Sequence, residues 1–175
     1  YPVKSMGGEV IESALLTREG IPGDRCWAVI DGELDEIRSA KRWPELLNYR
    51  ARLERDCSPA PGVFGEALPP VYISCPDDDT INSGEAEANE QLSELLGRPA
   101  RLAPLEPPSN RQHYRLANER SEESMTREMG LMDGEAMPDF AASMSAVLES
   151  LAEHVTPPGT YFDAFPLHLI STNTL

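Results

Sequence analysis

Short runs of apolar and β-branched residues recur through the first 105 residues, each about the length of a β-strand. The predicted strands are residues 10–17, 26–30, 47–53, 71–75 and 101–105. Between residues 47 and 53 apolar and polar positions alternate, which is the period of two that a half-buried strand shows. Asp31-Gly32, directly after the second run, is typical of a hairpin turn.

Two segments carry apolar residues at helical spacing instead. The first lies near residues 85–96 and precedes Gly97, which suits a left-handed C-cap; Asn82 or Ser83 is a candidate for its N-cap. The second covers residues 140–151, where apolar positions follow i, i+4, i+7, i+8.

Closely spaced strands with a helix between them indicate a β-rich α+β fold, a small antiparallel β-barrel with one or two packed helices. We expect the barrel domain to cover residues 1–105 and an acidic linker of loop and helix to cover residues 106–158. Residues 159–175 would then begin a second domain. Because the chain opens and closes in strand-like runs, we expect a segment of a longer protein.

Charge is unevenly distributed along the chain. The net charge of −15 argues against sequence-independent binding to nucleic acid or to anionic membranes. Residues 1–55 nevertheless hold 9 of the 15 Lys and Arg and only 10 of the 30 Asp and Glu. A local site for a small anion would explain this contrast, and so would a near-neutral sheet beside an acidic, solvated remainder.

Several missing sequence features indicate the cellular compartment and the chemistry of the cysteines. No apolar run reaches the roughly 18–20 residues of a membrane span, and no basic-then-apolar leader is present. Cys26, Cys57 and Cys75 form no C-x-x-C pair, so we expect neither a disulfide framework nor a cysteine zinc site. Cys26 and Cys75 lie in predicted strands and are expected to be buried and inert. A cytoplasmic protein fits best.

Lys4 and Ser5 follow a strand-like run and precede two glycines, Gly7 and Gly8. An ammonium, a hydroxyl and flexible backbone amides can together hold a phosphate or a similar oxyanion. The alternative is a surface lysine beside a glycine turn.

Two further cationic segments allow similar alternatives. Arg25 ends a Pro-Gly turn at the start of a predicted strand, where its guanidinium could fork onto a phosphate or simply pair with Asp24 at the surface. Lys41-Arg42 stands beside Trp43, either as a ring-binding cluster or as solvated cations next to a core indole. No Walker motif, G-x-G-x-x-G or H-E-x-x-H is present.

Taken together, these segments resemble the N-terminal β-barrel domain of MOSC proteins, relatives of the molybdenum cofactor sulfurase C-terminal domain and of the mitochondrial amidoxime-reducing component. The similar stretches are residues 1–5, 20–27, 39–42, 92–99 and 159–171. The last of them resembles the start of the MOSC domain proper. Each motif is modest by itself, but their common order makes the resemblance specific.

The resemblance implies binding of the molybdenum cofactor, a molybdopterin complex whose phosphate and oxygens are anionic. Matched position by position, Lys4, Ser5 and Arg25 correspond to contacts that the barrel makes with the cofactor, and Ser171 and Thr172 lie near contacts of the MOSC domain. The family's metal ligand is a cysteine well downstream of this chain, so we assign no metal ligand and no catalytic residue here.

The implied activity is reduction of N-hydroxylated small molecules or sulfur transfer, with electrons from a ferredoxin-like or flavin partner. We expect it only in a full-length protein and not in this segment alone. A partner- or substrate-binding β-barrel module without cofactor or catalysis is the alternative. A cysteine in a downstream β-rich segment would favour the enzyme, and its lack would favour the module.

Overall fold

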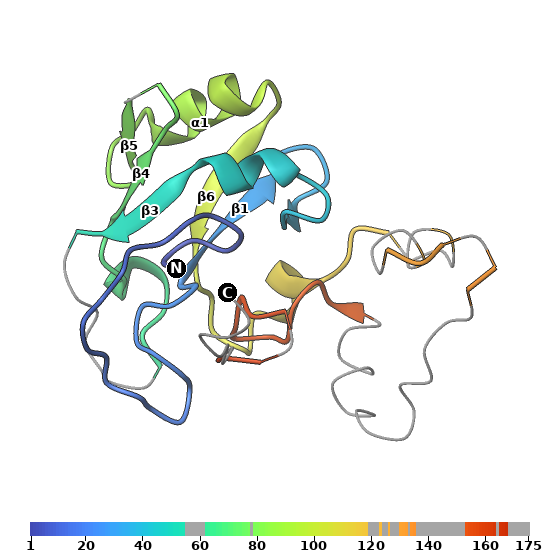
Figure 1. Ribbon diagram of the computed structural model, residues 1–175, viewed down its shortest axis with the longest axis horizontal. Coiled ribbons are helices and arrows are strands. Elements are labelled where there is room, and N and C mark those ends of the chain that lie inside the picture. Colours follow the sequence, from blue (N-terminus) through green and yellow to red (C-terminus); the bar gives the residue numbers. More distant parts are fainter. Residues whose placement is uncertain are drawn as a thin grey trace.

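The computed structural model in Figure 1 describes residues 1–54, 62–77, 79–118, 123, 126, 130–132, 134–135, 153–163 and 165–167. Its elements in chain order are β1 (Trp27–Asp31), β2 (Glu36–Ile37), the 3-10 turn η1 (Pro44–Asn48), β3 (Arg50–Leu53), η2 (Gly65–Ala67), β4 (Val71–Ser74), β5 (Thr80–Asn82), α1 (Ala88–Leu96), β6 (Ala100–Pro104) and η3 (Arg111–Tyr114). Short antiparallel strands with one α-helix confirm the predicted β-rich α+β class.

The strands form two three-stranded antiparallel sheets, ordered β2-β1-β6 and β3-β4-β5. In the first, β6 pairs with β1 over its whole length, and the two run side by side in Figure 1. The N-terminal segment joins the sheets, because Val3 pairs in parallel with Trp27 of β1 and Gly7 pairs in parallel with Arg50 of β3. The first seven residues are therefore part of the barrel-like framework.

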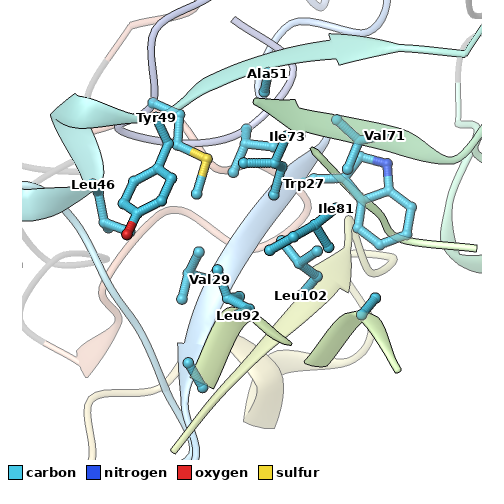
Figure 2. Close-up of a cluster of buried hydrophobic side chains, with 14 of the residues drawn as sticks. Trp27, Val29, Leu46, Tyr49, Ala51, Val71, Ile73, Ile81, Leu92 and Leu102 are labelled. Atoms are coloured by element: carbon cyan, nitrogen blue, oxygen red, sulfur yellow. The ribbon is translucent and has the colours of Figure 1, made fainter. Parts of the chain in front are cut away.

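Side chains from both sheets and from α1 meet in one hydrophobic core. Figure 2 shows Val29 of β1, Ile73 of β4 and Leu92 of α1 facing one another; each is at most 1% exposed. The helix ends as predicted at Gly97, whose φ of 65° places it in the left-handed region that favours glycine. Its N-cap is Glu87, so the predicted cap was wrong: Asn82 belongs to β5, and the Ser83 hydroxyl instead accepts the Val71 N–H.

The second face of the first sheet is covered by a smaller cluster. Ala28 and Ile30 alternate with the core residues of β1 and pack with Tyr114 and Tyr161, which are both completely buried. These tyrosines come from beyond the predicted barrel boundary. An isolated antiparallel bridge between Arg115 and His154 brings their two segments together.

The predicted strand at residues 10–17 was wrong. Val10, Ile11, Leu15 and Leu16 are exposed, and the segment contributes only the small bridge between Thr17 and Gly20 that closes a turn. Apolar, β-branched composition favours a strand only where a neighbouring strand supplies hydrogen bonds and cover. No named strand in the described part of the chain pairs with these residues.

The strand predicted at residues 47–53 starts later than expected. Pro44 begins a 3-10 turn that runs to Asn48, and Leu47 on this turn is exposed. A proline suits this position because its fixed φ is compatible with the first residue of a helical turn. From Tyr49 onward the predicted alternation holds, with Tyr49 and Ala51 buried. The helix predicted at residues 140–151 lies outside the described residues.

Candidate anion site

Backbone pairing at the N-terminus brings Lys4 and Arg25 together. The Lys4 N–H donates to the Trp27 carbonyl (2.9 Å), and the Arg25 N–H donates to the Tyr1 carbonyl (2.6 Å). Residues 1–4 therefore run parallel to residues 25–27, and two cations far apart in sequence start from neighbouring positions on the backbone. Backbone pairing between the N-terminal run and the segment after the Pro-Gly turn therefore places both cations in one region.

The Lys4 ammonium is buried, with 1% of the side chain exposed. It donates one hydrogen bond to the Tyr161 carbonyl (2.9 Å) and another to Oδ1 of Asp163 (2.8 Å). Burial lowers the pKa of Lys4 below 10.5, against the opposing attraction of Asp163, and the nearby charges of Arg25 and Lys41 lower it further. The positive charges of Arg25 and Lys41 therefore disfavour the protonated form of Lys4.

Asp163 receives attraction from all three of these cations. Burial would raise the pKa of its carboxyl group, but the charge and the hydrogen bond of Lys4, followed by the charges of Lys41 and Arg25, hold the pKa below 3.8. We call Lys4, Arg25 and Lys41 the cation cluster. Two of its members have aspartate partners: Lys4 pairs with Asp163, whose side chain is 64% exposed, and Arg25 pairs with Asp24.

Arg25 is anchored along one edge of the cation cluster. Its Nε and Nη2 donate to Oδ2 of Asp24 (2.9 and 2.7 Å), and Nη2 also donates to the Pro166 carbonyl (2.7 Å). The guanidinium lies over the Phe162 ring, 4.2 Å from its centroid. The predicted Asp24–Arg25 pair therefore exists, together with contacts to the segment that follows Tyr161.

Two non-glycine residues at the site adopt left-handed backbone conformations. Ser5, next to Lys4, has φ 64°, and Arg25 has φ 49°. Such conformations are uncommon outside glycine, asparagine and aspartate and cost free energy, and they concentrate at functional sites. Ser5 is half-buried beside Lys4.

Tyr161 fixes the carbonyl that holds Lys4. Its hydroxyl donates to the Pro104 carbonyl (2.9 Å) and lies 2.7 Å from Nε2 of His113. Because the hydroxyl proton is already used, the imidazole Nε2–H is the donor in the second bond. Burial lowers the pKa of His113, which keeps the ring neutral. The Tyr161 side chain is therefore locked to β6 and η3, and its backbone faces Lys4.

The structure brings three of the five predicted site residues near one another, and the other two lie outside the described residues. Lys4 and Arg25 both contact residues 161–167, and Ser5 adjoins Lys4. Ser171 and Thr172 lie outside the described residues. The expected role of Gly7 as an anion donor is wrong, because its N–H donates to the Tyr49 carbonyl (2.8 Å) in the pairing with β3.

The Lys41-Arg42-Trp43 segment divides between site and core. Trp43 is 5% exposed and belongs to the hydrophobic core, with the Arg98 guanidinium 4.9 Å from its ring centroid. Arg42 pairs with the buried carboxylate of Glu36 (2.9 Å). Lys41 is exposed and contributes its charge to the cation cluster.

Sequence reasoning missed Tyr161 and Asp163 as parts of the site. Both lie in the 159–171 stretch, where the family resemblance was noted, but nothing in the spacing of the residues pairs them with Lys4. Their only sequence signal is the turn at residues 157–160, where the Thr160 N–H donates to the Pro157 carbonyl (3.1 Å) and Gly159 has φ 84°.

The described residues bring together no group of three His, Cys, Asp or Glu side chains that could hold a metal ion. Cys26 and Cys75 are buried as expected, and burial raises the pKa of the Cys75 thiol, while Cys57 is not among the described residues. Among the helices of the described part, none is long and apolar enough to cross a bilayer.

Comparison with known proteins identifies the framework that carries this site. A family model described as the MOSC N-terminal beta barrel domain matches residues 1–99. The matched range includes Lys4, Ser5 and Arg25, the strands β1 to β5 and the helix α1, and it ends just before β6. Neither the curated proteins nor the solved structures gave a match. Because the matched residues make up more than half of the 175-residue chain, the chain belongs to the family of the MOSC N-terminal beta barrel domain.

Proposed function

We propose that the chain is the cofactor-facing N-terminal part of a MOSC-type protein that binds the molybdenum cofactor. One observation carries the proposal: the buried ammonium of Lys4 and the guanidinium of Arg25 gather at one place in a protein of net charge −15. Asp163 and Asp24 neutralise these two cations in the ligand-free protein, so an anionic ligand would take a position that a carboxylate now holds. The anionic phosphate of molybdopterin is a compound of the required charge.

The donor groups at the site fit the phosphate end of that cofactor. The Lys4 ammonium and the Arg25 guanidinium would hold phosphate oxygens by charge-assisted hydrogen bonds, and the Ser5 hydroxyl would be a further donor. Because no metal-ligating group is assembled among the described residues, these side chains would bind and orient the cofactor without ligating its metal. When bound, the cofactor supplies two-electron chemistry at molybdenum.

Catalysis in this proposal belongs to a longer protein. The proposed reactions are reduction of N-hydroxylated small molecules or sulfur transfer, in the cytoplasm, with a ferredoxin-like or flavin protein as electron donor. The cysteine ligand would lie downstream of this chain, and Ser171 and Thr172, which are outside the described residues, would contribute further polar contacts.

Cofactor content tests the proposal directly. The intact protein is purified from a host that makes the cofactor, as wild type, Lys4→Ala and Arg25→Ala. Each substitution removes a charge-assisted hydrogen bond, which corresponds to about 1.5–3 kcal/mol of binding. Molybdenum and pterin per protein should both fall, while Arg101→Ala, which breaks an exposed pair with Asp35 (2.6 Å), leaves them unchanged. Unchanged molybdenum and pterin in both site variants would overturn the proposal.

A partner-binding module is the second candidate function. The observation that favours it is the exposed apolar segment of residues 10–16, where Val10, Leu15 and Leu16 face solvent. Exposed apolar patches of this kind are typical of protein–protein contacts. If the intact wild-type protein carries neither molybdenum nor pterin in a cofactor-producing host, this module becomes the better account.

A further inference from the structure

The carboxylate of Asp163 lies where an anionic ligand of the cation cluster would place an oxygen. Its Oδ1 accepts the Lys4 hydrogen bond at 2.8 Å. A phosphate oxygen bound by Lys4 would need the same donor. Aspartate and phosphate therefore compete for one position.

The two members of the Lys4–Asp163 pair differ greatly in freedom. Lys4 is held by backbone pairing with Trp27 and by the Tyr161 carbonyl, and 1% of its side chain is exposed. The Asp163 side chain is 64% exposed, although the carboxylate is partly desolvated where it accepts from Lys4. Moving Asp163 into water costs little, whereas moving Lys4 would leave the Tyr161 carbonyl without its donor. The aspartate is the member that can give way.

We propose that Asp163 is a built-in competitor for the anion site: it neutralises Lys4 in the ligand-free protein and yields to a phosphate monoester. The proposal rests on the proposed function, because the phosphate of the cofactor would use the same site. It adds one residue that the sequence did not assign, an aspartate that opposes binding.

Counting charges shows the expected direction of the substitution. The side chains of Lys4 and Arg25 contribute two positive charges, which Asp163 and Asp24 pair with at 2.8 and 2.7 Å. Asp163→Asn keeps the shape of the side chain and raises the local charge by one. Its amide oxygen can still accept a hydrogen bond from Lys4, but it no longer supplies a negative charge that competes with phosphate.

Calorimetric titration with inorganic phosphate at low ionic strength tests the competition. The intact protein is purified without cofactor, as wild type, Asp163→Asn and Asp35→Asn. The last is the matched control, because Asp35 is also an exposed aspartate paired with a cation, Arg101, at 2.6 Å. The Kd of Asp163→Asn should be at least about tenfold lower than that of wild type, the low end for one charge-assisted hydrogen bond.

One result would overturn the proposal. If Asp163→Asn binds phosphate no more tightly than Asp35→Asn, the aspartate is only an anchor for its own segment. Should Asp163→Asn fail to fold, Asp163→Ser gives the same comparison with a smaller side chain.

The outcome is separable from the fate of the proposed function. Loss of molybdenum and pterin in Lys4→Ala, together with an unchanged phosphate Kd in Asp163→Asn, would refute the competition and leave the cofactor site standing. Tightened phosphate binding in Asp163→Asn, together with full cofactor content in Lys4→Ala, would establish an anion site that does not serve the cofactor.

Discussion

Replacing Lys4 by methionine separates a binding role from a structural one. The substitution removes the ammonium but keeps an unbranched side chain of similar volume in the buried site. The Tyr161 carbonyl then loses its donor, which costs about 1–3 kcal/mol. Against this, the protein no longer buries a charge whose desolvation outweighs the attraction of Asp163, as the lowered pKa of Lys4 indicates.

The fate of Asp163 sets the size of the net effect. Removing one partner of a buried ion pair usually costs about 3–5 kcal/mol, because the other charge stays buried and unpaired. Here the remaining carboxylate is 64% exposed and returns to water. We therefore expect Lys4→Met to lower the free energy of unfolding by less than about 2 kcal/mol, while cofactor content falls as strongly as in Lys4→Ala.

The pH dependence gives a second, independent signature of Lys4. The pKa of Lys4 in the folded protein lies below 10.5, the ordinary value that applies to the unfolded chain. Between the folded-state pKa and the unfolded-state pKa, the unfolded chain binds more protons than the folded protein. The free energy of unfolding of wild type, relative to that of Lys4→Met, should then rise as pH increases through this window. Taking the difference between the two proteins removes the contribution of the buried tyrosines, which both share.

Urea unfolding followed by tryptophan fluorescence measures both quantities. Trp27 and Trp43 are 8% and 5% exposed, so their emission reports loss of the core. Arg101→Met serves as the control for removal of an exposed cation. A loss above about 3 kcal/mol in Lys4→Met at neutral pH, or a flat pH difference up to pH 10, would show that Lys4 is a structural residue and would refute this reasoning.

Two more substitutions probe buried polar contacts of the framework. Asp31 accepts hydrogen bonds from the Arg38 guanidinium, and although burial alone would raise its pKa, these bonds hold the pKa below 3.8. Its contribution to stability is therefore present above that pH and lost as pH falls through the folded-state pKa. Asp31→Asn should cost about 1–3 kcal/mol at pH 7, because Arg38 loses one carboxylate partner and keeps the other, Glu36. Acid titration of its unfolding free energy should be flatter than that of wild type below about pH 4. Tyr161→Phe leaves the Pro104 carbonyl and His113 without the hydroxyl, so thermal or urea unfolding should show a loss of about 1–3 kcal/mol. Its backbone carbonyl persists, so cofactor content in Tyr161→Phe should fall less than in Lys4→Ala.

The parts of the fold that the sequence predicts are those that local chemistry decides. Residues 71–75 alternate in burial along β4 because a strand with one covered face requires that period. Gly97 ends α1 because its φ of 65° strains any residue with a Cβ. In both cases the requirement acts within a few residues, and a reader of the sequence can see it.

The parts that the sequence does not predict depend on a distant partner. Residues 10–17 have the composition of a strand but find no pairing edge in the described structure, and composition alone carries no information on that. Ala28 and Ile30 show that β1 is buried on both faces, yet their covers, Tyr114 and Tyr161, arrive from far along the chain. The Lys4–Asp163 contact spans 159 residues for the same reason.

The boundary of the family domain and the boundary of the site therefore differ. The family match ends at residue 99, and up to that point the chain supplies the cations, their backbone pairing and most of the hydrophobic core, which Ala100 and Leu102 complete. The groups that make a buried Lys4 tolerable, the Tyr161 carbonyl and the Asp163 carboxylate, lie past that end. A buried ammonium needs such partners because desolvation alone costs several kcal/mol. The barrel positions the positive charge, and residues 153–163 decide whether that charge is neutralised internally or presented to an anion.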